Sequence, residues 1–285
     1  MDVSGAFFDS HVRVYAKSFK KQSAWLSCGE WESGGVKVVL ISVLILVLVA
    51  AGWAVWKFSG NDWWEGFGKK EQLEKPDLEK YEQLVAELGS WRKELAAKHE
   101  AAKSAPEKAA VAQDARLILE LMMPEMMKCW LGTRYDFNGT AEKPGRGKVA
   151  CGYFVSTVLR DAGFVVDRYR LAQQPSENII RSFVKADFCH LQAGAHFDEY
   201  ANRLSKMDRG IYLVGLDSHV GFLVNGSEGW RFFHSSGWKA RGVVNEEMRK
   251  AGALRHSNWR MIGALSADSS VIQMWLSGAK VPVRQ

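Results

Sequence analysis

Residues 130–163 read WLGTRYDFNGTAEKPGRGKVACGYFVSTVLRDAG, a loop followed by a helix-forming pattern. The first part, 138–147, is rich in glycine and proline, which favours a loop. Gly163 is a typical residue just past the end of a helix. Cys151 stands where the loop gives way to the helix, so the pattern predicts an amphipathic helix with Cys151 in or just before its first turn. Apolar residues recur at the spacing of one helical face: Phe154, Val155, Val158, Leu159 and Ala162.

A cysteine at the start of a helix can act as a nucleophile. The thiolate is the reactive form, and the free N–H groups and the helix dipole lower the pKa of a thiol there. A neighbouring imidazole lowers that pKa further and can protonate a leaving amine. The alternative for Cys151 is a small buried apolar side chain, the usual environment of a free cysteine.

Two histidines lie at the ends of a predicted β-hairpin. Short apolar segments predict three strands, at 211–216, 219–224 and 230–234. A four-residue loop between the last two strands would place His219 opposite His234, whereas a five-residue loop would place Ser235 there. His219 is then a candidate base and His234 the group that orients its ring, as in catalytic triads generally. Either histidine alone would more often be structural.

These residues resemble the NlpC-type family of cell-wall cysteine endopeptidases, in the papain-like superfamily. The family shows a loop of the form L-G-x-x-Y…G, a cysteine that opens a helix, an H-V-G strand and a polar residue on the next strand. The matching segments cover less than half of the chain and are 131–135 with Gly139, 151–155, 219–221 and 233–236.

The resemblance implies an α+β fold in which the nucleophile helix packs on an antiparallel sheet. It also implies amide hydrolysis through an acyl-enzyme in peptidoglycan stem peptides, with Cys151, His219 and His234 as catalytic residues. Tyr135, Gly152 and Ser235 would lie at the substrate site, and the backbone N–H of Cys151 would help to bind the oxyanion. Neither a metal nor an organic cofactor is required.

Two positions depart from the family pattern. Ala150 replaces an acidic residue and Gly152 replaces a serine. The chain would therefore be a divergent member, and the departures concern the substrate more than the thiol chemistry.

Residues 38–56 read VVLISVLILVLVAAGWAVW and carry no charge. A helix needs about 20 apolar residues to cross a bilayer, so the segment predicts a single transmembrane helix, with Trp53 and Trp56 at the interface. A buried core helix is disfavoured because the segment would be apolar on every face. A cleaved signal peptide is disfavoured because the apolar run is too long and lies too far from Met1. More basic residues precede the segment than closely follow it. This favours a cytoplasmic N-terminus and a catalytic domain on the outer, periplasmic or extracellular, side.

The remaining regions complete the domain organisation. Residues 1–37 form a basic, amphipathic N-terminal segment, either lying on the inner leaflet or forming a short helix with no membrane role. The pattern in residues 57–113 predicts a solvated helical stalk, with a short coiled coil as the alternative, and residues 114–285 are the predicted hydrolase domain. A proline at 106 predicts a break before the next helix.

The charge distribution and the cysteines exclude some classes of protein. The formal net charge is +6, but no clustered basic face or nucleic-acid-binding motif is present, which argues against nucleic-acid binding. Four cysteines form no C-x-x-C pair, and Cys189-His190 with His196 fits no common zinc pattern. In an oxidising compartment Cys129 and Cys189 could pair and leave Cys151 free.

Three functions remain compatible with the sequence. The first is a membrane-anchored hydrolase of cell-wall peptides. The second is the same thiol chemistry facing the cytoplasm, as a hydrolase or acyltransferase on a protein or acyl substrate. The third is a non-catalytic wall-binding module. A polar run after the helix (Gln173, Gln174, Ser176 and Asn178) either contacts the substrate or belongs to a helix N-terminus capped by Ser176.

Overall fold

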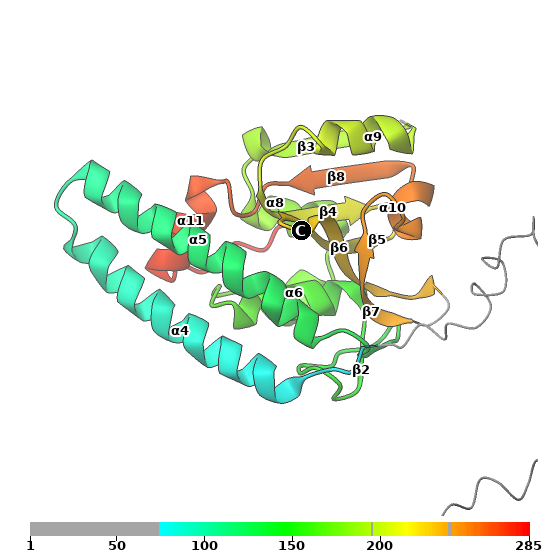
Figure 1. Ribbon diagram of the computed structural model, residues 1–285, viewed down its shortest axis with the longest axis horizontal. Helices are drawn as coiled ribbons and strands as arrows, with labels where there is room; N and C mark the ends of the chain where they lie inside the picture. The colour runs from blue at the N-terminus through cyan, green and yellow to red at the C-terminus, as the bar shows by residue number, and fades with distance from the viewer. Residues whose placement is uncertain (1–73, 195, 239–240) are drawn as a thin grey trace, which may run out of the picture. The chain divides into compact units, whose positions relative to one another are not determined.

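The computed structural model describes residues 74–194, 196–238 and 241–285 (Figure 1). Their fold is α+β, as expected: helices cover an antiparallel sheet with the strand order β3-β8-β4-β5-β6-β7. The strands are β3 (Cys189–Ala193), β4 (Gly210–Leu216), β5 (His219–Gly226), β6 (Gly229–Ser236), β7 (Gly242–Glu247) and β8 (Trp259–Gly263). Two short strands, β1 (Arg134–Tyr135) and β2 (Lys148–Val149), pair separately and in parallel.

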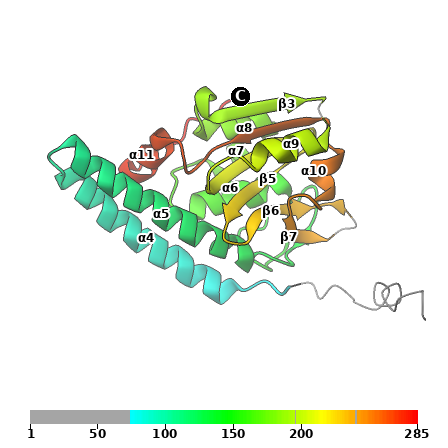
Figure 2. The same cartoon turned by 45° about the horizontal axis from the view of Figure 1, so that its top comes forward.

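Helices pack on both faces of the sheet (Figures 1 and 2). The larger core lies on one face and includes Phe222 and Phe233 of the sheet; the smaller core lies on the other and includes Leu223 and Phe232. The helices of the larger core are α4 (Leu78–Ala101), α5 (Ala105–Cys129), α6 (Cys151–Asp161), α7 (Arg168–Ala172), α8 (Ser176–Phe183) and α11 (Ser269–Ser277). Those of the smaller core are α9 (Phe197–Leu204) and α10 (Gly252–His256), and a 3₁₀ turn, η2 (Ala186–Phe188), precedes β3.

The region expected to be a solvated stalk is part of the compact domain. Helix α4 is buried along one side at Tyr81, Leu88 and Leu95, which belong to the larger core. The Tyr81 hydroxyl also hydrogen-bonds to Asp161 of α6, at 2.9 Å. Helix α5 runs without interruption through the expected boundary at 113/114, and the compact unit extends over 72–285. The apolar stripe of α4 therefore faces a core rather than a coiled-coil partner.

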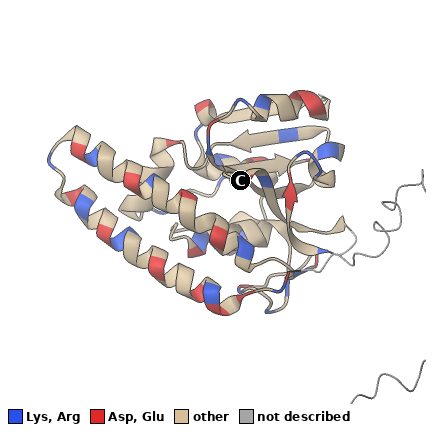
Figure 3. Ribbon diagram, viewed as in Figure 1, with Lys and Arg blue, Asp and Glu red and all other residues tan. Residues whose placement is uncertain are grey.

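The start of α5 agrees with the sequence. Ser104 and Glu107 form a capping box, in which each side chain binds the backbone N–H of the other residue. Pro106 lies in the first turn, where its missing N–H costs nothing. The predicted break before Pro106 is confirmed. Acidic and basic residues are interspersed along α4 and α5 (Figure 3).

The hairpin formed by β5 and β6 has a tighter turn than either expected register. Phe222 pairs with Phe233 and Gly226 pairs with Gly229, so the turn contains only Ser227 and Glu228. The pairing of the two strands is therefore shifted by two residues from the register expected with a four-residue loop. Side chains alternate between faces with a period of two, so His219 and His234 still share a face and become diagonal neighbours.

No helix within the described residues is long and apolar enough to cross a membrane. The predicted transmembrane segment 38–56 and the basic segment 1–37 lie outside these residues.

Candidate active site

Helix α6 begins at Cys151, as predicted. Ala150 is the residue before the helix, and its N–H donates to the carbonyl of Gly139 at 2.9 Å. The helix packs on the larger core through Phe154, Val155 and Val158, which are fully buried. The loop bond and the buried face together fix the position of the cysteine at the first turn.

Gly152 is required by a close approach of backbone. A Cβ added at this position would lie 2.3 Å from the carbonyl oxygen of Ala172, at the end of α7. The serine of the family pattern has no room here. Gly152 also lines the pocket beside Cys151.

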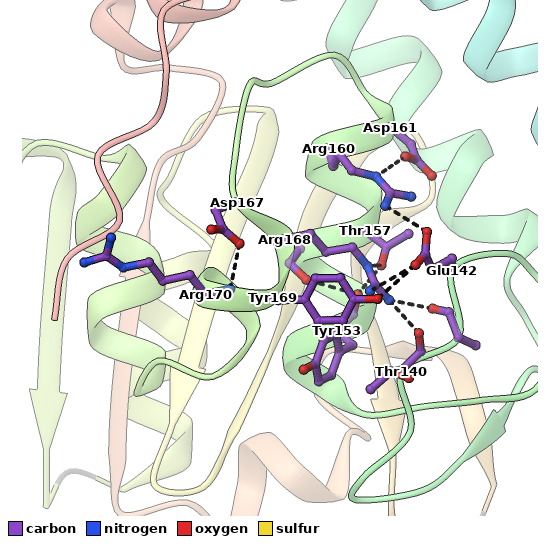
Figure 4. Close-up of polar contacts among 12 residues, drawn as sticks. Thr140, Glu142, Tyr153, Thr157, Arg160, Asp161, Asp167, Arg168, Tyr169 and Arg170 are labelled. Atoms are coloured by element: carbon purple, nitrogen blue, oxygen red, sulfur yellow. Dashed lines mark hydrogen bonds and ion pairs between the residues drawn. The ribbon is translucent and has the colours of Figure 1, made fainter.

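Arg168 joins the loop at 138–147 to helix α6 (Figure 4). Its Nε donates to the hydroxyl of Thr157 on α6 at 2.7 Å. Its Nη2 donates to the carbonyls of Thr140 and Ala141 in the loop, at 2.9 and 2.8 Å. One buried guanidinium therefore holds the loop and helix in a fixed relation.

Aromatic and acidic side chains surround this guanidinium. The rings of Tyr153 and Tyr169 lie 4.9 and 5.0 Å from the carbon of the Arg168 guanidinium, within the range of cation–π attraction. Glu142 accepts hydrogen bonds from Tyr169 and Arg160 on its two oxygens. Burial lowers the pKa of Arg168, and the nearby charge of Arg160 lowers it further.

The two histidines form a hydrogen-bonded row with a third group. His219 Nε2 lies 2.7 Å from His234 Nδ1, and His234 Nε2 lies 2.9 Å from Glu246 Oε2. The Phe232 ring stacks on His234, with 4.1 Å between centroids and 16° between planes. No local pattern in the sequence distinguishes Glu246, because its partner His234 lies 12 residues away on a neighbouring strand.

Gly221 makes this row possible. A Cβ at position 221 would lie 2.9 Å from the Cβ of His234 and 2.7 Å from the ring of Phe232. The glycine of the H-V-G segment therefore leaves space for the stacked pair beside it. This is a steric role, since its φ is not in the left-handed region.

Cys151 and His219 line the same pocket, which has a volume of about 670 Å³. The pocket lies where β4 ends and β5 begins, beside the N-terminus of α6. Among the hydrogen bonds of the described residues, none joins Cys151 Sγ to His219. Such contacts are often long in the absence of substrate and shorten in the reacting complex.

Burial determines the protonation states of the Cys151 thiol and the His219 imidazole. It raises the pKa of the Cys151 thiol, although the backbone N–H groups of Val220, Gly152 and Cys151 act in the opposite direction. Burial and then the nearby His234 lower the pKa of His219 to about 3. The expectation of a lowered thiol pKa is therefore wrong: desolvation of the thiolate outweighs the helix N-terminus, and both groups are uncharged at neutral pH.

The remaining predicted site residues lie in different places. Ser235 is fully buried on the other face of β6, and its hydroxyl donates to the carbonyl of Val149 at 2.6 Å. It is therefore not the partner of His219. Tyr135 is half-buried against Gly237; burial raises its pKa, and the nearby Cys151 adds to the rise.

The polar run after α7 contributes to the pocket. Gln173, Gln174 and Ser176 all line it, together with Trp259. Helix α8 begins at Ser176, but the hydroxyl of Ser176 donates to the carbonyl of Leu216 at 3.1 Å instead of capping the helix. The expected cap is wrong because the side chain binds the neighbouring strand.

The two other cysteines of the described residues, Cys129 and Cys189, are free thiols. Cys129 is buried, and burial raises its pKa to about 11. Cys189 also carries a free thiol, directed at the carbonyl of Val184. Within residues 74–194, 196–238 and 241–285, no group of three or more His, Cys, Asp or Glu side chains is arranged to hold a metal ion.

The fold and the candidate site are thus a helix that opens on a cysteine, packed on an antiparallel sheet that carries two histidines and a glutamate. No protein-family model, curated protein or solved structure matches the chain. The α+β class rests on the structure, and the NlpC-type resemblance stays a prediction from the sequence.

Proposed function

We propose that this chain is a membrane-anchored cysteine hydrolase that cleaves amide bonds in peptidoglycan stem peptides, with Cys151, His219 and His234 as the catalytic residues. Residues 38–56 would anchor the chain in the bilayer, with the catalytic domain on the outer side. The observation that carries the proposal is the row His219–His234–Glu246, which ends in the pocket that Cys151 also lines.

In the proposed mechanism, one nitrogen of His219 acts as the base. Its Nε2 is occupied by the hydrogen bond to His234, which leaves Nδ1 to accept the thiol proton. Since the resting pair is uncharged, the proton moves to Nδ1 as the Cys151 sulfur attacks the carbonyl carbon. The backbone N–H of Cys151, at the start of α6, is a donor for the oxyanion that forms.

The tetrahedral intermediate then collapses. The C–N bond breaks, and the amine leaves with the proton that His219 Nδ1 returns to it, so an acyl-enzyme remains on Cys151. Water then enters: Nδ1 removes its proton and the oxygen attacks the thioester carbonyl. The C–S bond breaks, the carboxylic acid product leaves, and Nδ1 returns the proton to the Cys151 sulfur. Each half-reaction is balanced without a metal or a redox partner.

The pocket lining supports a peptide substrate over a polyanion. Among the described residues that line it, none is Lys or Arg, and two are the carboxylates of Glu177 and Asp217. The amide side chains of Gln173 and Gln174 can both donate to and accept from a peptide backbone. Trp259 adds an apolar surface.

The test is cleavage of defined peptidoglycan fragments by the full-length protein in detergent, with products identified by mass spectrometry. We expect new amine-bearing fragments from the wild type and from Cys189→Ala, and none from Cys151→Ala. Cys189→Ala is a matched control because its thiol is also partly buried but lies outside the pocket. Cleavage that survives Cys151→Ala, or no cleavage by any form, would contradict the proposal.

A non-catalytic wall-binding module is the second candidate, favoured by the absence of a Cys151–His219 hydrogen bond. It is distinguished by sedimentation with purified peptidoglycan sacculi and by thiol labelling. Retained binding after Cys151→Ala, together with a Cys151 that alkylates no faster than Cys189, would support it.

The side of the membrane on which the Cys151 domain lies distinguishes a cell-wall substrate from a cytoplasmic substrate. A topology reporter fused after Gln285 reads this directly. An outer location is expected. A cytoplasmic location would instead leave a thiol hydrolase or acyltransferase acting on a protein or acyl substrate.

A further inference from the structure

The row of hydrogen bonds behind His219 crosses three neighbouring strands. His219 belongs to β5, His234 to β6 and Glu246 to β7. Glu246 pairs directly with Phe232, the residue that stacks on His234, so all of these side chains lie on one face of the sheet. His234 is 1% exposed, and both of its ring nitrogens have a protein partner.

Glu246 ends the row as a carboxylate. The hydrogen bond from His234 is the largest cause of a lowered Glu246 pKa, and the charges of Arg241 and Arg231 lower it further. Arg241 Nη1 lies 3.6 Å from the other carboxylate oxygen. An ionised carboxylate only accepts hydrogen bonds.

An acceptor at one end gives the whole row a single direction. His234 Nε2 must carry a proton to donate to Glu246, so neutral His234 has a lone pair on Nδ1. His219, which lines the pocket, must then donate from Nε2, and this leaves a lone pair on its own Nδ1. A row that ran the opposite way would place a proton on His219 Nδ1 and remove the base.

We infer that Glu246 is a positioning residue: through His234 it selects the tautomer of His219 in which Nδ1 can accept the Cys151 proton. The inference rests on the proposed function for its catalytic consequence, but the tautomer itself exists in the resting protein. Glu246 touches neither the substrate pocket nor the reacting atoms, so it acts only through His234.

Glu246→Gln removes the selection with little change in shape. The amide can present either its oxygen or its NH₂ group to His234. When the NH₂ group donates to His234 Nε2, the row reverses and His219 becomes protonated on Nδ1. Glu247→Gln is the matched control, because Glu247 follows on the same strand and its carboxylate pairs with Lys250 at 2.7 Å.

The decisive measurement is ¹⁵N NMR of the full-length protein with ¹⁵N-labelled histidine side chains, which reports which ring nitrogen carries the proton. His219 and His234 signals are assigned by their loss in His219→Gln and His234→Gln. The wild type and Glu247→Gln should show protonated Nε2 at both residues. Glu246→Gln should shift His219 partly or wholly to protonated Nδ1.

Activity gives the second measurement. Glu246→Gln should lower kcat at least about 10-fold, with KM little changed, because the wrong tautomer blocks the chemical step and not binding. Glu246→Asp keeps the acceptor and should recover part of the rate, which a purely structural role for the side chain would not explain.

The two measurements separate the inference from the proposed function. Unchanged His219 tautomers in Glu246→Gln would overturn the inference whatever the activity. The expected tautomers together with no hydrolysis by any form would leave the inference standing and count against the hydrolase instead.

Discussion

Cys151 reaches the pocket from a helix on one face of the sheet, whereas His219 belongs to the row on the other face. The start of β5 brings Cys151 and His219 near each other. The backbone N–H of Val220 contacts the Cys151 sulfur, and His219 directly precedes Val220 in the chain. Neither side chain carries a charge in the resting site. The reactivity of the thiol is therefore governed by its burial more than by the helix that it opens.

We expect alkylation of Cys151 to become faster over the whole range from about pH 6 to about pH 10. Burial raises its pKa, so the thiolate fraction at neutral pH is smaller than in an exposed cysteine and grows as the pH approaches that raised value. The measurement is iodoacetamide labelling of the full-length protein, mapped by mass spectrometry. A rate that is already constant below about pH 7 would indicate a thiolate–imidazolium pair and contradict this expectation.

Gly221→Ala should displace the stacked pair of Phe232 and His234. The new methyl group would lie within 3 Å of both side chains in a packed interior, which typically costs about 1–3 kcal/mol. The hydrolysis rate should fall even under conditions where the variant remains folded, because His234 can no longer hold His219. Gly226→Ala, in the same strand but facing open space, is the control and should leave the rate unchanged. Equal rates in both variants would contradict the steric account.

At the scale of elements, the loop 138–147 and helix α6 act as one unit because Arg168 binds both. Arg168→Lys keeps the charge but cannot reach Thr157 and the two loop carbonyls together. We expect a loss of about 1–3 kcal/mol in unfolding free energy, measured by urea denaturation. Arg170→Lys, on the same short helix, should be neutral. A neutral Arg168→Lys would show that the loop is held by other contacts.

Local patterns were sufficient for the elements that carry the site. The helix at Cys151 and the strands that carry His219 and His234 follow from spacing within a few residues, and the structure confirms them. The register was not predictable, because Asn225 and Gly226 are typical turn residues but extend β5 instead. Glu246 was not predictable either: its partner is 12 residues away on another strand, and only the three-dimensional pairing shows that it faces a buried histidine.

The same limit explains the error about the stalk. The apolar stripe of α4 has helical spacing, and this is equally typical of a coiled coil and of a helix on a core. Its partners are far away in the sequence: Tyr81 binds Asp161, and Arg92 Nε donates to the carbonyl of Trp275 at 2.7 Å. The periodicity identified the face that is buried but not what covers it.

For the whole molecule, the consequence is that α4 should contribute to the global stability of the domain. Leu88 is completely buried in the larger core, so Leu88→Ala should lower the free energy of unfolding by about 2–5 kcal/mol. Leu117→Ala, on the exposed side of α5, should change it by less than about 0.5 kcal/mol. Denaturant unfolding of the full-length protein in detergent, followed by tryptophan fluorescence and by near-ultraviolet circular dichroism, gives both values.

The shape of the transition also matters. If α4 is integral to the domain, the two probes should report one coincident transition that moves to lower denaturant in Leu88→Ala, and the site should be lost with it. A solvated stalk would give a different result: Leu88→Ala would leave the midpoint unchanged, or a separate early transition would appear while Cys151 labelling stayed at its native rate. The expected single transition would mean that the folded unit includes α4, and that a fragment starting near Asp114 would expose the core that α4 covers.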